Sequence, residues 1–131
     1  MDTTLEPIRV MYVRAASAPV GVQRAFDELE SKLSTMKGRR FYGTFDMKTK
    51  EYRACVEQVE GDDPVSLGLA TCTIPGGRYV RQKVDDWGSK LHQIPQLFEG
   101  MAQGRRADPS RPSLEFYRSR SELVLYLPVA D

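Results

Sequence analysis

The segment VQRAFDELESKLSTM, residues 22–36, carries its apolar side chains at intervals of four, three, four and three residues. This spacing places all of them along one stripe of an α-helix. The stripe consists of Val22, Phe26, Leu29, Leu33 and Met36. We therefore expect a helix that starts near Ala18, has Pro19 in its first turn and ends at Gly38.

The segment WGSKLHQIPQLFEGM, residues 87–101, repeats the same intervals 65 residues later in the chain. Its stripe consists of Trp87, Leu91, Ile94, Phe98 and Met101. We expect a second helix here, which Pro95 kinks or divides near Ile94 because proline interrupts the helical hydrogen-bond ladder.

Short extended segments surround both helices in a similar order. Runs rich in β-branched and aromatic residues predict strands at 7–15, 40–46, 52–59, 67–74, 77–84, 113–118 and 122–129. A hairpin loop is expected at 46–51, a break at 61–64 and a longer loop at 104–112. The order strand, helix, strand, strand thus occurs twice.

The repeat predicts an α+β fold of duplicated β-α-β-β units. The units form one mostly antiparallel sheet, with two helices on one face and a ligand cleft between the halves. We expect a single domain over residues 1–131, with halves at about 5–60 and 66–131.

Composition excludes several classes of protein. The 131 residues are 40% hydrophobic and 28% charged, which is a globular balance. Lys and Arg number 19 against 18 Asp and Glu, for a net charge of +1. No overall field therefore draws the protein to nucleic acid or acidic lipid, and no segment has the length and apolar character of a membrane helix.

The cysteines and the N-terminus point to a cytoplasmic protein. Met1 to Glu6 lacks the basic and apolar regions of a secretory signal. Cys55 and Cys72 each lie in an apolar run, so we expect two reduced, packed thiols. His92 is the sole histidine and zinc-site spacings are absent, so no metal and no cofactor is expected.

Strand alternation predicts which side chains line the cleft. In 113–118, Leu114 and Phe116 alternate with Glu115 and Tyr117. We assign the first pair to the core beneath the helices, and the second pair then faces the helix-free side.

The same assignment applies to the other strands. Phe41 and Phe45 point to the core, as do Leu123, Leu125 and Leu127, while the alternating residues face the cleft. Those cleft residues are Tyr42, Thr44, Val124 and Tyr126.

A carboxylate among tyrosines suits an organic cation with an aromatic body. Aromatic faces attract cations, and a carboxylate in such a wall is costly to desolvate unless a positive partner arrives. The alternative is that Glu115 faces water and pairs with Arg118 or Arg120.

Two motifs carry a family resemblance. The runs Ile-Pro-Gly-Gly-Arg-Tyr at 74–79 and Pro-Ser-Leu-Glu-Phe-Tyr at 112–117 flank the Trp-containing helix and precede a strand that ends Leu-Pro-Val at 127–129. Together with Phe-Tyr-Gly-Thr-Phe-Asp at 41–46, they resemble the GyrI-like small-molecule-binding family. The effector-binding domains of the drug-sensing regulators BmrR and Rob are similar.

The resemblance implies a duplicated fold whose cleft takes cationic, lipophilic ligands. It places an acidic residue at Glu115, with Tyr117 in the same motif. Trp87 either packs in the core or lines the cleft. The regulators carry a DNA-binding segment ahead of this domain, whereas here a strand is expected from residue 7, so no direct nucleic-acid binding is expected.

Three functions follow from these observations. The first is a stand-alone module that binds lipophilic, cationic or aromatic small molecules at Glu115, Tyr117, Tyr42, Tyr126 and Trp87. The second, implied by similar stand-alone proteins, is a hydrolase that opens cyclopropane-bearing DNA-alkylating compounds.

In the hydrolase, Glu115 would be the general base, and Tyr117 or Tyr42 would bond the developing oxygen anion. The third function is a gyrase-modulating interaction module, for which the dense acidic segment is Glu57, Glu60, Asp62 and Asp63. The sequence specifies a small-molecule partner and no membrane partner, and it does not specify an oligomeric state.

Overall fold

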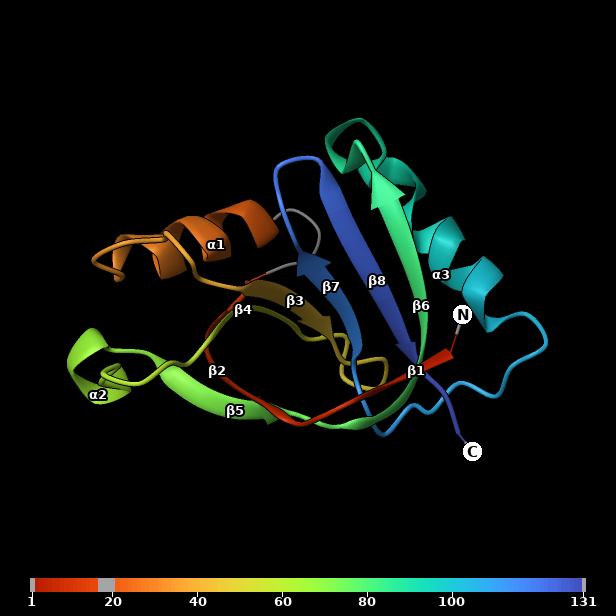
Figure 1. Ribbon diagram of the computed structural model, residues 1–131, viewed down its shortest axis with the longest axis horizontal. Helices are drawn as coiled ribbons and strands as arrows, with labels where there is room; N and C mark the ends of the chain where they lie inside the picture. Colours follow the sequence, from red (N-terminus) through yellow and green to blue (C-terminus); the bar gives the residue numbers. More distant parts are fainter. Residues whose placement is uncertain (1, 17–20, 131) are drawn as a thin grey trace.

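The computed structural model describes residues 2–16 and 21–130 as one curled antiparallel sheet with helices against it (Figure 1). The eight strands lie in the order β1-β6-β8-β7-β3-β4-β2-β5. They are β1 (Asp2–Leu5), β2 (Ile8–Arg14), β3 (Phe41–Phe45), β4 (Tyr52–Glu57), β5 (Ala70–Ile74), β6 (Gly77–Asp85), β7 (Ser113–Tyr117) and β8 (Glu122–Pro128). The predicted α+β class and antiparallel sheet are confirmed.

The helices are α1 (Val22–Ser31), α2 (Pro64–Leu67) and α3 (Ile94–Ala102), with short 3-10 turns η1 (Trp87–Ser89) and η2 (Leu91–Gln93) before α3. α1 packs on β2 and β4, and α3 packs on β6 and β8. Phe41 of the α1 cluster and Tyr117 of the α3 cluster are register partners, so both helices lie on one face of the sheet. None of the described helices is long and apolar enough to cross a membrane.

The first helix is shorter than predicted. It ends at Ser31, so Leu33 and Met36 lie beyond it, and Met36 is 49% exposed. The weak helix formers Ser34 and Thr35 follow, which explains why the helix ends before its apolar stripe does. Pro19, expected in its first turn, lies outside the described residues.

The second helix is divided as predicted. α3 begins at Ile94 with Pro95 in its first turn, where the missing N–H breaks no helical hydrogen bond. The residues before it form 3-10 turns instead of α-helix. Leu91, assigned to the buried stripe, is therefore wrongly placed and is 52% exposed.

Two elements were not predicted. β1 has the polar sequence Asp-Thr-Thr-Leu, which lacks an apolar alternation. α2 is a single turn in which Asp63 accepts a hydrogen bond from the Ser66 N–H and Pro64 occupies the first position. The break expected at 61–64 is therefore partly the cap of a helix.

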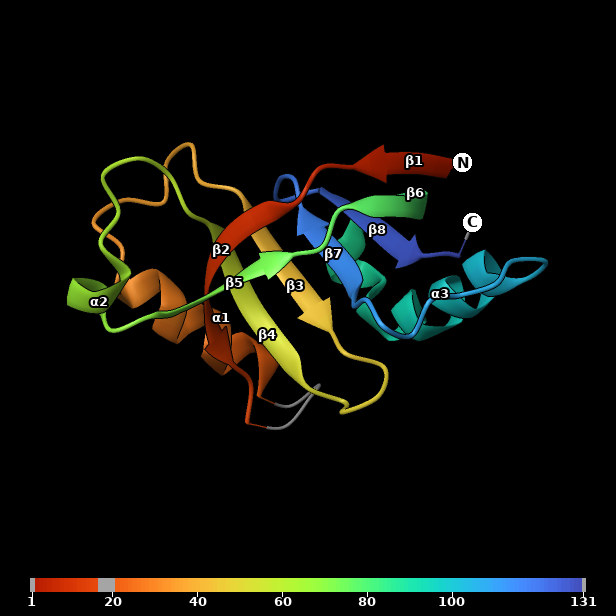
Figure 2. The same ribbon diagram turned by 90° about the horizontal axis from the view of Figure 1, so that it is seen from below.

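The two halves of the chain exchange their edge strands. β1 pairs with β6, and β2 pairs with β5, all antiparallel (Figure 2). The chain bends at Pro7 between β1 and β2, and it bends again at Pro75 and Gly76 between β5 and β6. These two bent segments run alongside each other in opposite directions. Each half of the sheet is therefore completed by the other.

Gly76 allows these two chains to meet. A Cβ atom there would lie 2.8 Å from the Leu5 carbonyl oxygen and 2.9 Å from the Pro7 nitrogen, both of which are backbone atoms. Gly77 follows with a φ of +127°, a backbone conformation that residues with a side chain rarely adopt. The Arg111 guanidinium lies over this turn and donates to the carbonyl of Arg78 at 3.1 Å.

Strand β7 faces the opposite way from our prediction. Leu114 and Phe116 belong to the cluster on the helix-free face, while Tyr117 packs with the α3 cluster. Glu115, which alternates with Leu114 and Phe116, therefore also faces the helices. The prediction was wrong because the curled sheet covers its own inner face, so both faces of β7 contact apolar groups.

We predict that Gly76→Ala lowers the free energy of unfolding by about 1–3 kcal/mol, because backbone atoms at the crossing cannot yield to the methyl group. Urea unfolding measures this change. Gly100→Ala is the matched control: Gly100 is helical with nothing within 4 Å, so the same methyl should leave stability unchanged or raise it by up to about 1 kcal/mol. Equal effects in the two variants would contradict the crossing geometry.

Candidate functional site

The candidate site centres on Glu115, at the seam where the two halves of the sheet meet. Its register partners are Gly43 on β3 and Leu125 on β8. Its oxygen Oε1 accepts a hydrogen bond from the Tyr52 hydroxyl at 2.6 Å and another from the Tyr117 hydroxyl at 2.7 Å. The carboxylate is therefore held from both sides by neutral donors.

Gly43 makes the contact with Tyr52 possible. Tyr52 pairs with Phe45 on β3, so its ring must reach diagonally across that strand to meet Glu115 on β7. A Cβ atom at Gly43 would lie 1.8 Å from the Tyr52 hydroxyl and 2.6 Å from its Cζ. The glycine leaves the space through which the phenol passes.

Aromatic side chains from both halves surround the carboxylate. Phe26 of α1 and Trp87 of η1 each pack edge-on against Tyr117, with ring centroids 5.2 Å apart in both pairs. Phe26 also meets the Tyr52 ring at 6.4 Å. The Trp87 indole N–H donates to the Ser119 carbonyl at 3.1 Å, which fixes the ring at the end of β7.

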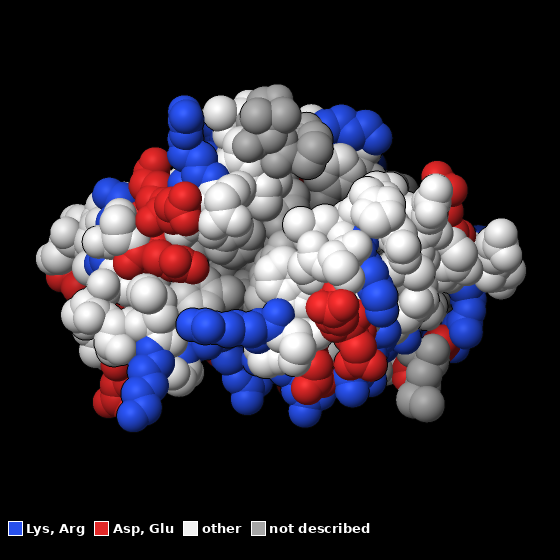
Figure 3. Space-filling model, turned by 90° about the horizontal axis from the view of Figure 1, so that it is seen from above, with Lys and Arg blue, Asp and Glu red and all other residues white. Residues whose placement is uncertain are grey.

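This arrangement lies between the two helical lobes. Figure 3, which looks onto the helix-covered face, shows the surface hollowed between the lobe that carries α1 and the lobe that carries α3. The side chains of Phe26, Tyr52, Trp87, Glu115 and Tyr117 meet on this same face, and we call the site that they form the interhelical groove. The hollow between the two lobes therefore lies on the helix-covered face, whereas the cleft was predicted on the helix-free face.

Both tyrosines are neutral donors at any ordinary pH. Burial raises the pKa of Tyr52 and of Tyr117, and the adjacent Glu115 carboxylate raises both further because a phenolate beside it would be repelled. Neither phenol can therefore act as a base, and each can keep donating to Oε1.

Among the residues that the structure describes, no cationic side chain neutralises Glu115. Arg118, one of the two predicted partners, lies 4.0 Å from Glu122 instead. Within residues 2–16 and 21–130, no Lys or Arg lies within ion-pair distance of Glu115. The alternative in which Glu115 pairs with Arg118 or Arg120 is therefore wrong.

The predicted site residues fall into two groups. Glu115, Tyr117 and Trp87 meet in the interhelical groove. Tyr42 and Tyr126 lie on the helix-free face, in the cluster there. A role in ligand binding for these two tyrosines stays a prediction, and it would concern a surface separate from Glu115.

The helix-free tyrosines already have aromatic partners. Tyr42 stacks on Phe116 with ring centroids 4.9 Å apart, and Tyr126 meets Tyr79 edge-on at 6.1 Å. Tyr42 is buried, and burial raises the pKa of its phenol. These contacts make the inner face of the curled sheet a packed core.

Sequence reasoning missed two groove residues. Phe26 was assigned to the helical stripe alone, and Tyr52 was assigned only to a strand. The available signal was Gly43, a glycine inside a strand beside the Glu115 strand, because such a glycine marks the close approach of another group.

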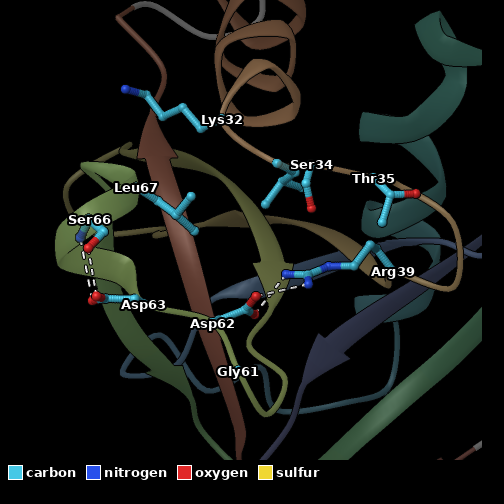
Figure 4. A pocket seen from close by; sticks show the side chains of 10 residues that line it. Lys32, Ser34, Thr35, Arg39, Gly61, Asp62, Asp63, Ser66 and Leu67 are labelled. Atoms are coloured by element: carbon cyan, nitrogen blue, oxygen red, sulfur yellow. Dashed lines mark hydrogen bonds and ion pairs between the residues drawn. The ribbon is translucent and has the colours of Figure 1, made fainter.

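A second hollow lies apart from the groove, between the segment after α1 and the turn that leads into α2 (Figure 4). It measures about 420 Å³. Arg39 and Asp62 form a bidentate pair within it, and Asp63 accepts from the Ser66 hydroxyl at 2.6 Å. Asp62 and Asp63, two residues of the expected acidic segment, are thus engaged in hydrogen bonds within the fold.

Comparisons with known proteins identify the fold and no family. No family model matches the chain, and no curated protein matches its sequence. Among solved structures, the integron cassette protein VCH_CASS2 from the mobile metagenome of Vibrio cholerae superposes with a TM-score of 0.74 at 12% identity, covering 99% of this chain and 95% of that one.

Two further structures are similar. SAV2435, solved bound to tetraphenylphosphonium, has a TM-score of 0.64 at 10% identity and covers 99% of this chain and 93% of its own. A hydrolase from Listeria innocua has a TM-score of 0.57 at 13% identity, with 99% and 90% coverage. At these identities the likeness shows that the chain shares their fold.

We predict that Gly43→Ala lowers the free energy of unfolding by about 1–3 kcal/mol, because the methyl group displaces the Tyr52 ring. In a Tyr52→Leu background, which lacks Cζ and the hydroxyl, the same change should cost much less. Urea unfolding of the four proteins of this double-mutant cycle measures the coupling. Equal costs in both backgrounds would show that Tyr52 does not pass over Gly43.

Proposed function

We propose that this protein binds lipophilic organic cations in the interhelical groove, with Glu115 as the counter-charge. One observation carries the proposal: the carboxylate is held by two phenols among aromatic rings, and no cation of the described chain neutralises it. A bound cation would supply the missing charge.

The energetics favour a ligand with an aromatic body. Burial of apolar surface contributes about 25 cal/mol per Å². Phe26, Trp87 and Tyr117 offer such surface and also attract a cation to their ring faces. A partly buried carboxylate without a cationic partner loses hydration as the groove fills. A neutral ligand of the same shape does not compensate for this loss, so it should bind more weakly than a cation.

Two likenesses support this class of ligand. SAV2435, which has the same fold, was solved with tetraphenylphosphonium bound. The motifs at 74–79 and 112–117 resemble those of the GyrI-like family, whose ligands are lipophilic cations. We propose on the same grounds that residues 1–131 form one such domain.

We predict that Glu115→Gln weakens binding of tetraphenylphosphonium by about 10- to 100-fold, because the charge is lost while the shape is kept. Trp87 is the single tryptophan and packs on Tyr117, so its fluorescence reports occupancy of the groove directly. Titration of wild type and variant at constant ionic strength gives the two dissociation constants.

Glu57→Gln is the matched control for this titration. Glu57 lies on β4 and its side chain is 36% exposed, so the substitution removes the same charge outside the groove. It should change the dissociation constant by less than about twofold. A Glu115→Gln protein that binds as tightly as Glu57→Gln would disprove the proposed role of the carboxylate.

Hydrolysis of cyclopropane-bearing alkylating compounds is the second candidate function. The specific observation is that both tyrosine bonds go to Oε1, which leaves Oε2 able to take a proton from water as a general base. Tyr42 lies on the other face, so of the two predicted donors only Tyr117 lies beside Glu115, and its single O–H would have to leave Oε1 to bond the developing oxygen anion. A fold relative described as a hydrolase agrees with this option.

Product stoichiometry separates the two candidates. If the protein only binds a cyclopropane-bearing alkylating compound, the ring should stay intact and the compound should be retained in at most stoichiometric amount. Ring-opened product in excess over protein, lost in Glu115→Gln, would establish turnover. Chromatography with mass detection measures both outcomes.

A further inference from the structure

The two oxygens of the Glu115 carboxylate have unequal surroundings. Oε1 accepts both phenol hydroxyls, which occupy its two lone-pair directions. Oε2 has no hydrogen-bond donor among the described residues, and it is not among their fully buried, unpartnered polar atoms. One oxygen of the carboxylate is therefore engaged in the fold, and the other is left without a hydrogen bond from the described residues.

The fold enforces this inequality. Tyr52 is 6% exposed and reaches Glu115 only through the space above Gly43, so its hydroxyl has little freedom to turn elsewhere. Tyr117 packs edge-on against both Phe26 and Trp87, which limits the movement of its ring. Both phenols stay protonated, so the occupation of Oε1 does not change with pH in the ordinary range.

We infer that the groove discriminates among organic cations by their N–H groups, and that Tyr52 is a specificity-determining residue. The groove favours phosphonium and quaternary ammonium ions over primary ammonium ions that carry the same aromatic body. This inference rests on the proposed function, and it adds a rule about which cations are accepted.

The rule follows from hydrogen-bond capacity. A primary ammonium group carries three N–H donors, each of which must find an acceptor when water is removed. The carboxylate oxygen left to accept lies among aromatic edges and faces, which are poor acceptors, and the other acceptors in this cluster are the oxygens of the two phenols that already bond Oε1. A quaternary ion has no N–H group to satisfy, so it gains the attraction of the charge without this penalty.

A matched pair of ligands tests the inference. The two are 3,3,3-triphenylpropylammonium and its N,N,N-trimethyl derivative, which share the triphenyl body. Each is titrated against wild type, Tyr52→Phe and Tyr117→Phe by the fluorescence of Trp87. Either substitution frees one lone pair on Oε1, so we expect the preference for the trimethyl ion to fall by about tenfold in each variant.

The design removes the contribution of the methyl groups. Their extra apolar surface favours the trimethyl ion equally in wild type and variants, so only the change in the ratio is used. Tyr12→Phe is the control: Tyr12 lies in the cluster of the helix-free face, and loss of its hydroxyl should leave the ratio unchanged. Tyr117→Phe keeps the test decisive if Tyr52→Phe does not fold.

The possible outcomes separate this inference from the proposed function. A lower ratio in the tyrosine variants supports the inference. An unchanged ratio, with both ions still bound, overturns it and leaves the cation site intact. Failure of wild type to bind either ion, or tetraphenylphosphonium, overturns the proposed function and the inference together.

Discussion

The close passage of two backbones at Gly76 is the constraint on which the rest of the structure depends. There the turn between β5 and β6 meets Leu5 and Pro7, with no room for a side chain. The sheet is continuous because β3 pairs with β7 at the seam, and the groove lies over these two strands. Each half also lends its leading strand to the outer edge of the other, which ties the two edges together and curls the sheet. The Pro-Gly-Gly sequence at 75–77 is therefore explained by chain geometry before any role in ligand binding.

The order of elements was predictable, and the faces of the strands were not. Helical stripes, Pro95 and the hairpin at 46–51 are local signals, and each led to an element near its expected place, although α1 ends early at Ser31 and the second stripe begins in 3-10 turns. Side-chain direction in β7 is different. Alternation separates Leu114 from Glu115 but does not say which set meets the helices when both faces are covered. Phe116, stacked on Tyr42 inside the curl, shows why apolar character alone misled the assignment.

The site could be predicted only in part, for a related reason. Glu115 and Tyr117 stand two residues apart in one strand, so their neighbourhood is visible in the sequence. Tyr52 lies 63 positions before Glu115 and reaches it across a third strand. Such a contact depends on sheet order and on the absence of a side chain at Gly43, neither of which periodicity reports.

The near-neutral charge of the chain gains meaning from this geometry. Several acidic side chains elsewhere in the fold are held by cations, as in the pairs of Asp62 with Arg39, Asp108 with Arg111 and Glu122 with Lys83. Such pairs cancel at short range and leave no field to attract a ligand from a distance. Glu115 instead is held by phenols, which orient it without cancelling its charge. In the proposed function, the charge that selects the ligand is therefore that of Glu115, which lies among the aromatic rings of the interhelical groove.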